Sequence, residues 1–334
     1  MRISIIGAGS WGSALAELAA RCGHDVLLWA HDPEVAEAIR RTRSNPVYLP
    51  SVEFPPSVRV TSSLDEAAAF ASTLLVVTPS HHYRAVLGGL APSLNGPVRI
   101  VSGTKGIEND SLERISEISG EVLGDRLAAF AVLSGPTFAL EVSRGDPTAA
   151  VVASTDLRFA ELIQHELSCG TFRLYHSDDV VGVELGGSLK NVVAIAAGVV
   201  EGLGLGTNTM AALITRGLHE IRRLGVALGG RPETFAGLAG MGDLVLTCTG
   251  SLSRNRSVGV ALGRGRRLEE ILRETRLVAE GVKTCRSARD LAGRLGVEMP
   301  ITLEMDRVLH EGEAPQTAIE RLMGRTLKAE VEGE

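Results

Sequence analysis

Short apolar runs alternate with stretches of helical periodicity through the first half of the chain. Residues 10–22 show the helical spacing, with Leu15, Leu18 and Ala19 on one face. Apolar runs of this length between helical segments indicate βαβ units, so we predict a doubly wound, mostly parallel sheet. The predicted strands are residues 2–6, 25–30, 58–63, 72–80, 98–106, 128–138 and 148–154.

The strand pattern stops near residue 180, and the second half of the chain has helical spacing. We place the boundary at residues 176–179. It divides the chain into an α/β domain of residues 1–179 and an all-helical domain of residues 180–334. The predicted helical segments are residues 181–204, 209–229, 268–296 and 303–312, followed by an acidic tail at 328–334.

The first apolar run leads directly into the pattern Gly7-x-Gly9-x-x-Gly12. Glycines let backbone N–H groups approach phosphates, and the helix N-terminus adds unpaired donors and a positive dipole. A tight turn without a ligand can carry the same glycines, but the strand–turn–helix context favours a dinucleotide site. We therefore predict a Rossmann-like first domain. Because its first strand starts at residue 2, we expect no targeting segment.

Composition and charge narrow the function classes. Of the 334 residues, 44% are hydrophobic and 22% are charged, as in soluble globular proteins. The net charge of −6 argues against a nucleic-acid partner or an anionic membrane surface. The most apolar stretch, residues 180–200, contains Glu184 and Lys190, which disfavours a membrane span. We expect a cytoplasmic protein that is not embedded in a membrane.

The four cysteines are Cys22, Cys169, Cys248 and Cys285. They form no CxxC pair and show no metal-ligand spacing. This usage is typical of reduced thiols in a cytoplasm, so we predict free cysteines and no metal site.

Lys190 is the strongest candidate for chemistry. It lies beside Asn191 within an apolar helical segment that offers little polar surface. A lysine at the domain rim, with its stem covering apolar surface, is the alternative. A lysine held in a cleft serves as a general acid or base, because its pKa responds strongly to its surroundings.

Two further segments place polar groups at the ends of predicted strands. Lys105 lies in a tight turn, where a solvated loop lysine is the alternative. Residues 134–138 (SGPTF) offer backbone donors and Thr137, or else a simple proline turn. His81 and His82 follow another strand, and we expect a capping or surface role for them.

The helical half carries two polar segments. Ser253, Arg254 and Asn255 combine a guanidinium with neutral donors, which suits a phosphate, although a solvated charge run has the same composition. Asp243 and Thr247 lie four residues apart and share a helical face. Asp243 either caps a helix or points into the cleft and pairs with a lysine.

These motifs, in this order, resemble those of the bacterial NAD(P)-dependent glycerol-3-phosphate dehydrogenases, from the first strand to about residue 325. The motifs that carry the resemblance are GAGSWG (7–12), TPSH (78–81), TKGIE (104–108), SGPTFA (134–139), ELGGSLKNVVAI (184–195), ALITRGL (212–218), GMGDLVLTCTGSLSRN (240–255), VAEG (278–281) and GVEMPI (296–301).

The resemblance implies a role for each matching residue. It makes Lys190 the proton donor and acceptor, in a catalytic cluster with Lys105, Asp243, Thr247 and Asn191. It implies substrate binding by Lys105, Gly135, Thr137, Lys190, Asp243, Ser253, Arg254 and Asn255. It implies cofactor binding by Gly7, Gly9, Ser10, Trp11, Gly12, His31, Lys105, Ala139, Arg254, Val278 and Glu280.

The implied reaction is the reversible NAD(P)H-dependent reduction of dihydroxyacetone phosphate to sn-glycerol 3-phosphate, which supplies phospholipid synthesis. A homodimer is expected by analogy. Because Asp32 lies beyond the end of the second strand and His31 precedes it, we expect both cofactors to work, with NADP(H) slightly favoured. Arg40, Arg41 or Arg43 would assist His31 at a 2′-phosphate.

Three alternative functions remain open at this point. One is a hydroxyacid dehydrogenase of the same two-domain plan, acting on a carboxylate. Another is a nucleotide-binding sensor without catalysis, which would not need Lys105, Lys190 and Asp243 together. The last is a subunit whose helical half serves mainly as an oligomer interface.

Overall fold

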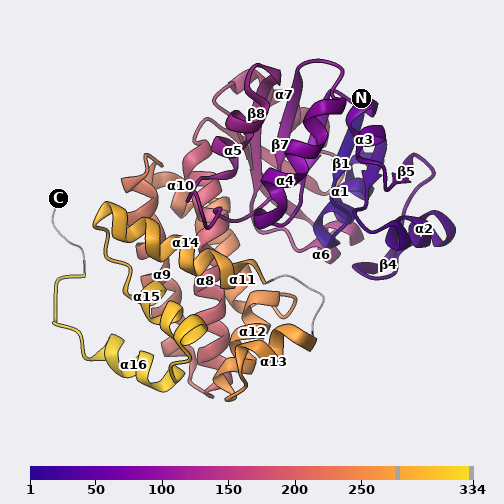
Figure 1. Ribbon diagram of the computed structural model, residues 1–334. Helices are drawn as coiled ribbons and strands as arrows, with labels where there is room; N and C mark the ends of the chain where they lie inside the picture. Colours follow the sequence, from indigo (N-terminus) through magenta and orange to yellow (C-terminus); the bar gives the residue numbers. More distant parts are fainter. Residues whose placement is uncertain (275–278, 331–334) are drawn as a thin grey trace.

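The computed structural model describes residues 1–274 and 279–330 and has two parts (Figure 1). A sheet flanked by helices is formed by the N-terminal half, and a helical bundle by the C-terminal half. The predicted fold class, a Rossmann-like doubly wound sheet followed by an all-helical part, is confirmed.

Eight strands form the main sheet, in the order β10-β9-β8-β7-β6-β1-β2-β5. They are β1 (Arg2–Ile6), β2 (Asp25–Trp29), β5 (Val58–Thr61), β6 (Thr73–Val76), β7 (Val98–Ser102), β8 (Leu127–Ser134), β9 (Thr148–Ala153) and β10 (Phe172–Ser177). All neighbouring strands pair in parallel except β8 and β9, which are antiparallel. The predicted strands are present: β1 has the predicted bounds, the others end earlier than predicted, and β10 was not predicted.

Helices cover both faces of the sheet. One face packs against α1 (Ser10–Arg21), α2 (Pro33–Thr42), α6 (Ala139–Arg144) and α7 (Leu157–Leu167). The other packs against α3 (Leu64–Phe70), α4 (Ser80–Leu90) and α5 (Ile115–Leu123). Alternate residues of a strand point to opposite faces, so Ile5 joins the first apolar layer and Ile6 the second. Short 3₁₀ turns follow α4 (η1, Ala91–Ser93) and α5 (η2, Gly124–Arg126).

The helical part is built around α8 (Val180–Gly202) (Figure 1). Around it lie α9 (Thr207–Ala227), α10 (Pro232–Ala236), α11 (Asp243–Thr249), α12 (Arg254–Gly263), α13 (Leu268–Glu274), α14 (Glu280–Leu295), α15 (Pro300–Asp306) and α16 (Pro315–Met323). π-helical turns precede α11 (η3, Leu238–Gly242) and follow α15 (η4, Arg307–Glu311). The predicted segment 268–296 is two helices, α13 and α14, in the described residues.

Glycines let α8 and α12 cross in close contact. A Cβ atom on Gly198 would lie 2.0 Å from the carbonyl oxygen of Arg256, and one on Gly259 would lie 1.9 Å from that of Ile195. Larger residues at these positions would push the helices apart. The close crossing keeps the N-terminus of α12, which carries the predicted phosphate ligands, next to the centre of α8.

One described helix, α8, is long and apolar enough to cross a membrane. Of its qualifying 18-residue window, 94% is buried inside the protein. Its apolar side chains are therefore covered by the surrounding helices and by the sheet, and Glu184 and Lys190 make polar contacts with Arg114 and Asp243.

The cysteine prediction was wrong for two of the four residues. Cys22 and Cys169 form a disulfide, with Cα atoms 5.6 Å apart, whereas Cys248 and Cys285 are free and buried. Cys22 follows the end of α1 and Cys169 lies in the turn between α7 and β10. These two turns are 147 residues apart in sequence. Spacing along the chain could not reveal the pair, because only the packing of α1 and α7 on the same sheet face brings them together.

A small antiparallel hairpin was also missed. It consists of β3 (Ser44–Asn45) and β4 (Leu49–Glu53). Its first strand places Asn45 against the glycine turn, where the Nδ2 atom donates to the Ala8 carbonyl oxygen at 2.8 Å. The hairpin thus supports the predicted nucleotide turn from outside the sheet.

Candidate active site

The glycine turn lies at the carboxyl end of β1, an inner strand between β6 and β2. Gly7 has a φ of +119°, and a Cβ atom on it would lie 2.9 Å from the carbonyl oxygen of Val77. A Cβ atom on Gly12 would lie 1.8 Å from the carbonyl oxygen of Gly7, whereas one on Gly9 would meet nothing within 4 Å. Gly7 and Gly12 are therefore required by the fold itself. Gly9 leaves open space in front of the N-terminus of α1, where a phosphate group fits.

Three strand ends meet beside this turn. β1, β6 and β7 are neighbours in the sheet, so the segments that follow them share one edge. The Thr104 hydroxyl donates to the carbonyl oxygen of Thr78 at 2.9 Å, which joins the segments after β7 and β6. Ligands bind at this edge in open α/β sheets.

Two lysines share one carboxylate close to this edge. Lys190 Nζ lies 2.6 Å from Oδ1 of Asp243, and Lys105 Nζ lies 2.6 Å from Oδ2. Lys190 also donates to the Thr247 hydroxyl at 2.5 Å. The predicted pairing of Asp243 with a cleft lysine is present, and the rim position considered for Lys190 is excluded by its 6% exposure.

Close contacts of α8 bring these groups together. A Cβ atom on Gly186 would lie 2.7 Å from the carbonyl oxygen of Ala239, so α8 approaches η3 closely and Asp243 starts α11 next to Lys190. A Cβ atom on Gly187 would lie 2.5 Å from the Ser134 hydroxyl, so α8 also contacts the end of β8. The pair Gly186 and Gly187 therefore places Lys190 between the sheet and the helical part.

The cluster has an excess of positive charge. With all three groups ionised, two ammonium groups face one carboxylate. Burial, the largest cause, and the charge of Lys105 together lower the pKa of Lys190 to about 8, against the opposing effect of Asp243. A lysine with this pKa exchanges its proton near neutral pH and can also stabilise negative charge on an oxygen.

The segment after β8 contributes mainly backbone. Lys105 Nζ contacts the carbonyl oxygen of Gly135 at 3.3 Å, and the Thr137 hydroxyl donates to the same oxygen at 3.2 Å. Gly135 has a φ of +145°, and a Cβ atom on it would lie 2.9 Å from the Cα of Ala150. The sequence SGPTF is thus both a tight turn and a neighbour of the lysine cluster.

The residues at the start of α12 divide into structural and exposed groups. Ser253 caps the helix by accepting the Arg256 N–H at 3.2 Å. Asn255 donates to Asn191 Oδ1 and accepts from Gly281 N–H, both at 3.0 Å, so it joins α8, α12 and α14. Arg254 is solvent-exposed, although burial by surrounding protein lowers its pKa and the charge of Glu280 opposes this. Arg254 is thus open to solvent and also surrounded by protein, as expected for a side chain that lines a concave surface.

The remaining predicted cofactor residues lie around the glycine turn and across from it. Ser10 donates to the Tyr48 carbonyl oxygen at 2.8 Å, and Ala139 starts α6, which packs beside Trp11. Among the described residues, the buried Trp11 Nε1 has no acceptor. Glu280, at the start of α14, accepts the Ser80 hydroxyl at 2.7 Å. Val278 lies outside the described residues.

The residues expected at a 2′-phosphate site follow the end of β2, and several of them already have partners within the protein. His31 is exposed and its ring packs edge-on against Trp29, whereas Asp32 caps α2 by accepting the Glu34 N–H at 2.9 Å. Arg40 pairs with Glu37 and donates to Val60. Arg43 donates to the carbonyl oxygens of Val58, Phe54 and Pro55. Arg41 is exposed, as His31 is.

The predicted histidines start α4. The His81 and His82 rings are 4.0 Å apart. Burial, together with the charges of Lys283 and His82, lowers the pKa of His81 to about 4, so its imidazole is neutral at pH 7.

Sequence reasoning missed the contacts that hold the Lys105 turn. The Gly106 N–H donates to the Ser188 hydroxyl at 2.8 Å. A Cβ atom on Gly106 would lie 2.4 Å from the Ser80 hydroxyl and 3.3 Å from Oε2 of Glu280. Ser80, Ser188 and Glu280 are far apart in sequence, and no local pattern indicated that they converge.

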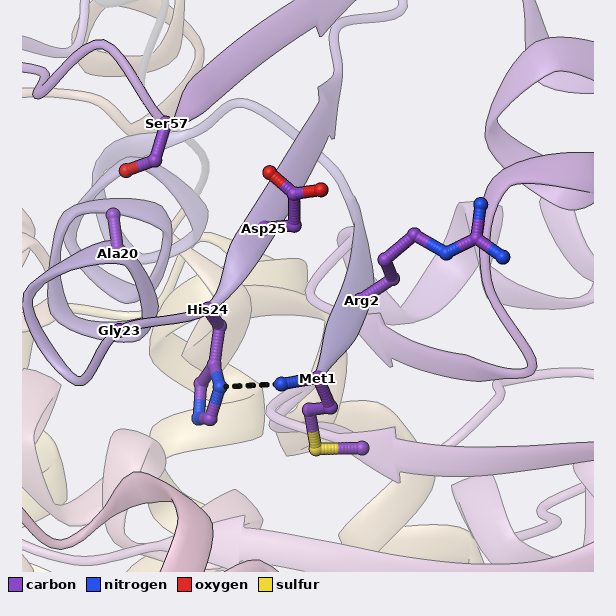
Figure 2. Close-up of a pocket in the computed structure, with 7 residues that line it drawn as sticks. All are labelled: Met1, Arg2, Ala20, Gly23, His24, Asp25 and Ser57. Carbon is purple, nitrogen blue, oxygen red and sulfur yellow. Dashed lines mark hydrogen bonds between the residues drawn. The ribbon is translucent and has the colours of Figure 1, made fainter.

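Two pockets lie away from the lysine cluster. One, of about 440 Å³, is at the amino edge of the sheet and is lined by residues that include Met1, His24, Asp25 and Ser57 (Figure 2). Figure 2 shows the hydrogen bond of 3.1 Å between the His24 Nδ1 atom and the Met1 amino group. The other, of about 700 Å³, lies between α14, α15 and α16. Neither pocket is lined by Lys105, Lys190 or Asp243.

Comparison with known proteins agrees with this geometry. Residues 2–160 match the N-terminal family model of NAD-dependent glycerol-3-phosphate dehydrogenase, and residues 179–320 match the C-terminal one. The chain is 55% identical to a glycerol-3-phosphate dehydrogenase (NAD(P)+) from Geobacter sulfurreducens, over 98% of each chain. It is 53% identical to one from Syntrophotalea carbinolica, over 99% of this chain and 100% of that one.

A solved structure is similar over nearly the whole chain. The glycerol-3-phosphate dehydrogenase from Coxiella burnetii is 40% identical, with a TM-score of 0.93, and the match covers 97% of this chain and 99% of that one. The resemblance inferred from the motifs is therefore confirmed, and the chain belongs to the NAD-dependent glycerol-3-phosphate dehydrogenase family.

Proposed function

We propose that this protein is an oxidoreductase that reduces dihydroxyacetone phosphate to sn-glycerol 3-phosphate with NADH or NADPH, reversibly. The observation that carries the proposal is the pair of lysines on Asp243, beside the edge of the sheet where the glycine turn lies. Family membership and relatives more than 50% identical along the chain support the same activity.

Lys190 moves the proton. When bound, the nicotinamide supplies or accepts the hydride at C2 of the substrate. In the direction of reduction, the Lys190 ammonium donates a proton to the C2 oxygen, and in the reverse direction its amine accepts that proton. Asp243 and Thr247 orient Nζ through bonds of 2.6 and 2.5 Å.

Lys105 stabilises the negative charge that develops on the substrate oxygen. Its Nζ is held by Oδ2 of Asp243 and the Gly135 carbonyl oxygen, and its side chain is 19% exposed. It therefore reaches both the lysine cluster and the open edge. A preorganised cation of this kind lowers the barrier because it needs no reorientation during the reaction.

The substrate phosphate binds at the start of α12 and beside the turn after β8. Arg254 contributes a guanidinium, and residues Gly135, Thr137, Ser253 and Asn255 shape the surrounding surface. Asn191 holds Asn255 in place. Binding the phosphate away from the reacting carbon fixes the orientation of the ketone.

The nucleotide lies along the glycine turn. The pyrophosphate of the nucleotide binds to the residues of this turn, which are Gly7, Gly9, Ser10, Trp11 and Gly12. The open space at Gly9 and the Trp11 N–H, which has no acceptor, are suited to a polar ligand. His31 meets the adenosine ribose. Lys105, Ala139, Arg254, Val278 and Glu280 are assigned to the nicotinamide nucleotide by the family motifs.

The same proposal includes the organisation of the chain. Residues 1–179 form the dinucleotide-binding domain, and residues 180–334 form the substrate and catalytic domain. The protein acts in the cytoplasm as a homodimer, without nucleic-acid partners and without embedding in a membrane, and it supplies glycerol phosphate for phospholipid synthesis.

The decisive experiment follows the absorbance of NADPH, and then of NADH, after addition of dihydroxyacetone phosphate. Rapid oxidation of either cofactor establishes the activity, and the ratio of rates shows whether His31 favours the 2′-phosphate. Oxidation with 2-keto or 3-keto acids but not with dihydroxyacetone phosphate would overturn the proposed substrate in favour of a hydroxyacid dehydrogenase.

A further inference from the structure

The two halves of the chain are joined by a hydrogen bond at the edge of the sheet. Ser80 starts α4, is 2% exposed, and donates its hydroxyl to Oε2 of Glu280 at 2.7 Å. Glu280 starts α14, 200 residues farther along the chain. The bond therefore links the sheet to the helical part at one defined point.

This point lies directly beside the predicted nucleotide crevice. Ser80 follows β6, and the segment just before it, at Val77, contacts Gly7 of the glycine turn. Gly103, after β7, lies against Val77 and Trp11, since a Cβ atom on it would be 2.6 Å and 3.0 Å from their side chains. The Ser80–Glu280 bond thus borders the crevice formed by the ends of β1, β6 and β7.

The backbone of the Lys105 turn packs against the same bond. Gly106 has no side chain and a φ of +158°, and its position leaves no room for a Cβ atom between Ser80 and Glu280. On its other side, the Gly106 N–H donates to Ser188 of α8. If Glu280 moved, the turn that carries Lys105 would therefore lose one of the groups it packs against.

The carboxylate also influences the phosphate-binding end of the cleft. Burial raises the pKa of Glu280, and contacts with Ser80 and the charges of Arg254 and Lys283 oppose this rise. In return, the charge of Glu280 favours the charged form of Arg254. Ser80 thus holds a group that lies near both Lys105 and Arg254.

Resting on the function proposed above, we propose that Ser80 is a positioning residue that fixes Glu280 and the Lys105 turn in the conformation that receives the nicotinamide nucleotide. Ser80 acts through Glu280 and Gly106, and it takes no part in hydride or proton transfer.

The test compares Ser80→Ala with Ser80→Thr and with a control, Ser93→Ala. Ser93 also donates its hydroxyl to a carboxylate, that of Asp65, but between η1 and α3 and away from the crevice. We expect Ser80→Ala to raise the dissociation constant of NADPH, measured by calorimetry without substrate, roughly five- to tenfold. The KM for NADPH should rise by a similar factor with kcat nearly unchanged. Ser80→Thr, which keeps the hydroxyl, should restore binding, and Ser93→Ala should bind as the wild type does.

Two outcomes separate this inference from the proposed function. Wild-type protein that binds no nicotinamide nucleotide contradicts the proposed function itself. Equal NADPH binding by the wild type and by Ser80→Ala, with both proteins folded as judged by circular dichroism, would overturn the role of Ser80 and leave the proposed function standing. If Ser80→Ala and Ser93→Ala lose the same stability and bind NADPH equally well, the Ser80–Glu280 hydrogen bond only stabilises the fold, and the proposal is wrong.

Discussion

The ammonium group of Lys190 lies 2.6 Å from Oδ1 of Asp243, with both residues at most 6% exposed. Lys105 occupies the other oxygen of the same carboxylate. One buried carboxylate thus aligns two cations that come from different halves of the chain. This arrangement fixes the orientation of Lys190, whose pKa burial lowers to about 8 against the opposing effect of Asp243.

Replacing Lys190 with methionine should abolish turnover and leave nucleotide binding intact. Methionine keeps much of the side-chain volume but cannot donate a proton, and general acid catalysis contributes about 10²- to 10⁴-fold to the rate. The kcat for dihydroxyacetone phosphate reduction and the dissociation constant of NADPH provide the two measurements. An unchanged kcat would show that another group protonates the substrate.

Replacing Lys105 with methionine should move the alkaline limit of activity to higher pH. Reduction requires protonated Lys190, so kcat falls as the pH rises through the Lys190 pKa, about 8 in the wild type. Because the charge of Lys105 lowers that pKa, its removal should raise it. The pH profile of kcat at saturating substrate tests this shift. A limit that stays in place, or moves to lower pH, would contradict the electrostatic coupling.

Arg254→Ala should weaken binding of the phosphorylated substrate. Loss of a charge-assisted bond to phosphate should raise the KM for dihydroxyacetone phosphate about 10- to 100-fold. Arg256→Ala is the matched control, because Arg256 lies on the same helix but pairs with Glu201. A defect confined to NADPH binding would show that Arg254 serves only the cofactor.

The double variant Cys22→Ser/Cys169→Ser should be less stable but fully active. The disulfide closes a loop between residues 147 positions apart, and its removal should lower the free energy of unfolding by about 2–5 kcal/mol. It lies beyond the C-terminal end of α1, whereas the glycine turn precedes the N-terminal end, so turnover should persist. Urea unfolding with and without reductant provides the measurement. Wild-type protein whose midpoint is insensitive to reductant would show that the bond does not contribute.

Glu220→Gln should reduce the pH dependence of stability. Glu220 is 3% exposed and accepts the N–H groups of Ile301 and Thr302 at the start of α15. Burial raises its pKa to about 7, so the folded state holds this proton more tightly than the unfolded chain does. Its contribution to stability is therefore complete below about pH 4.5 and falls by about 3 kcal/mol as the pH rises through 7. Unfolding free energies of both proteins between pH 5 and 8 test this, and parallel curves would exclude Glu220 as the source.

Local sequence patterns predicted the fold class and every strand of the main sheet except β10. The alternation of apolar runs with helices fixes a doubly wound sheet, because a strand and a helix bury their apolar faces with different periods. The glycine turn was predictable, since Gly7 and Gly12 allow backbone contacts that no other residue permits. Lys190 was a candidate because the apolar helix offers a lysine little polar surface, and the structure decided for burial over a position at the domain rim.

Contacts between distant segments decided the rest. Only the close approach of α8 to η3 at Gly186 places Asp243 between Lys105 and Lys190, and only the packing of α1 and α7 on one face joins Cys22 to Cys169. The sequence alone therefore determined which groups could do chemistry and which elements carry them. The tertiary structure determined their partners, and through burial and neighbouring charge it set the pKa of Lys190, because both depend on distances in space that no spacing along the chain encodes.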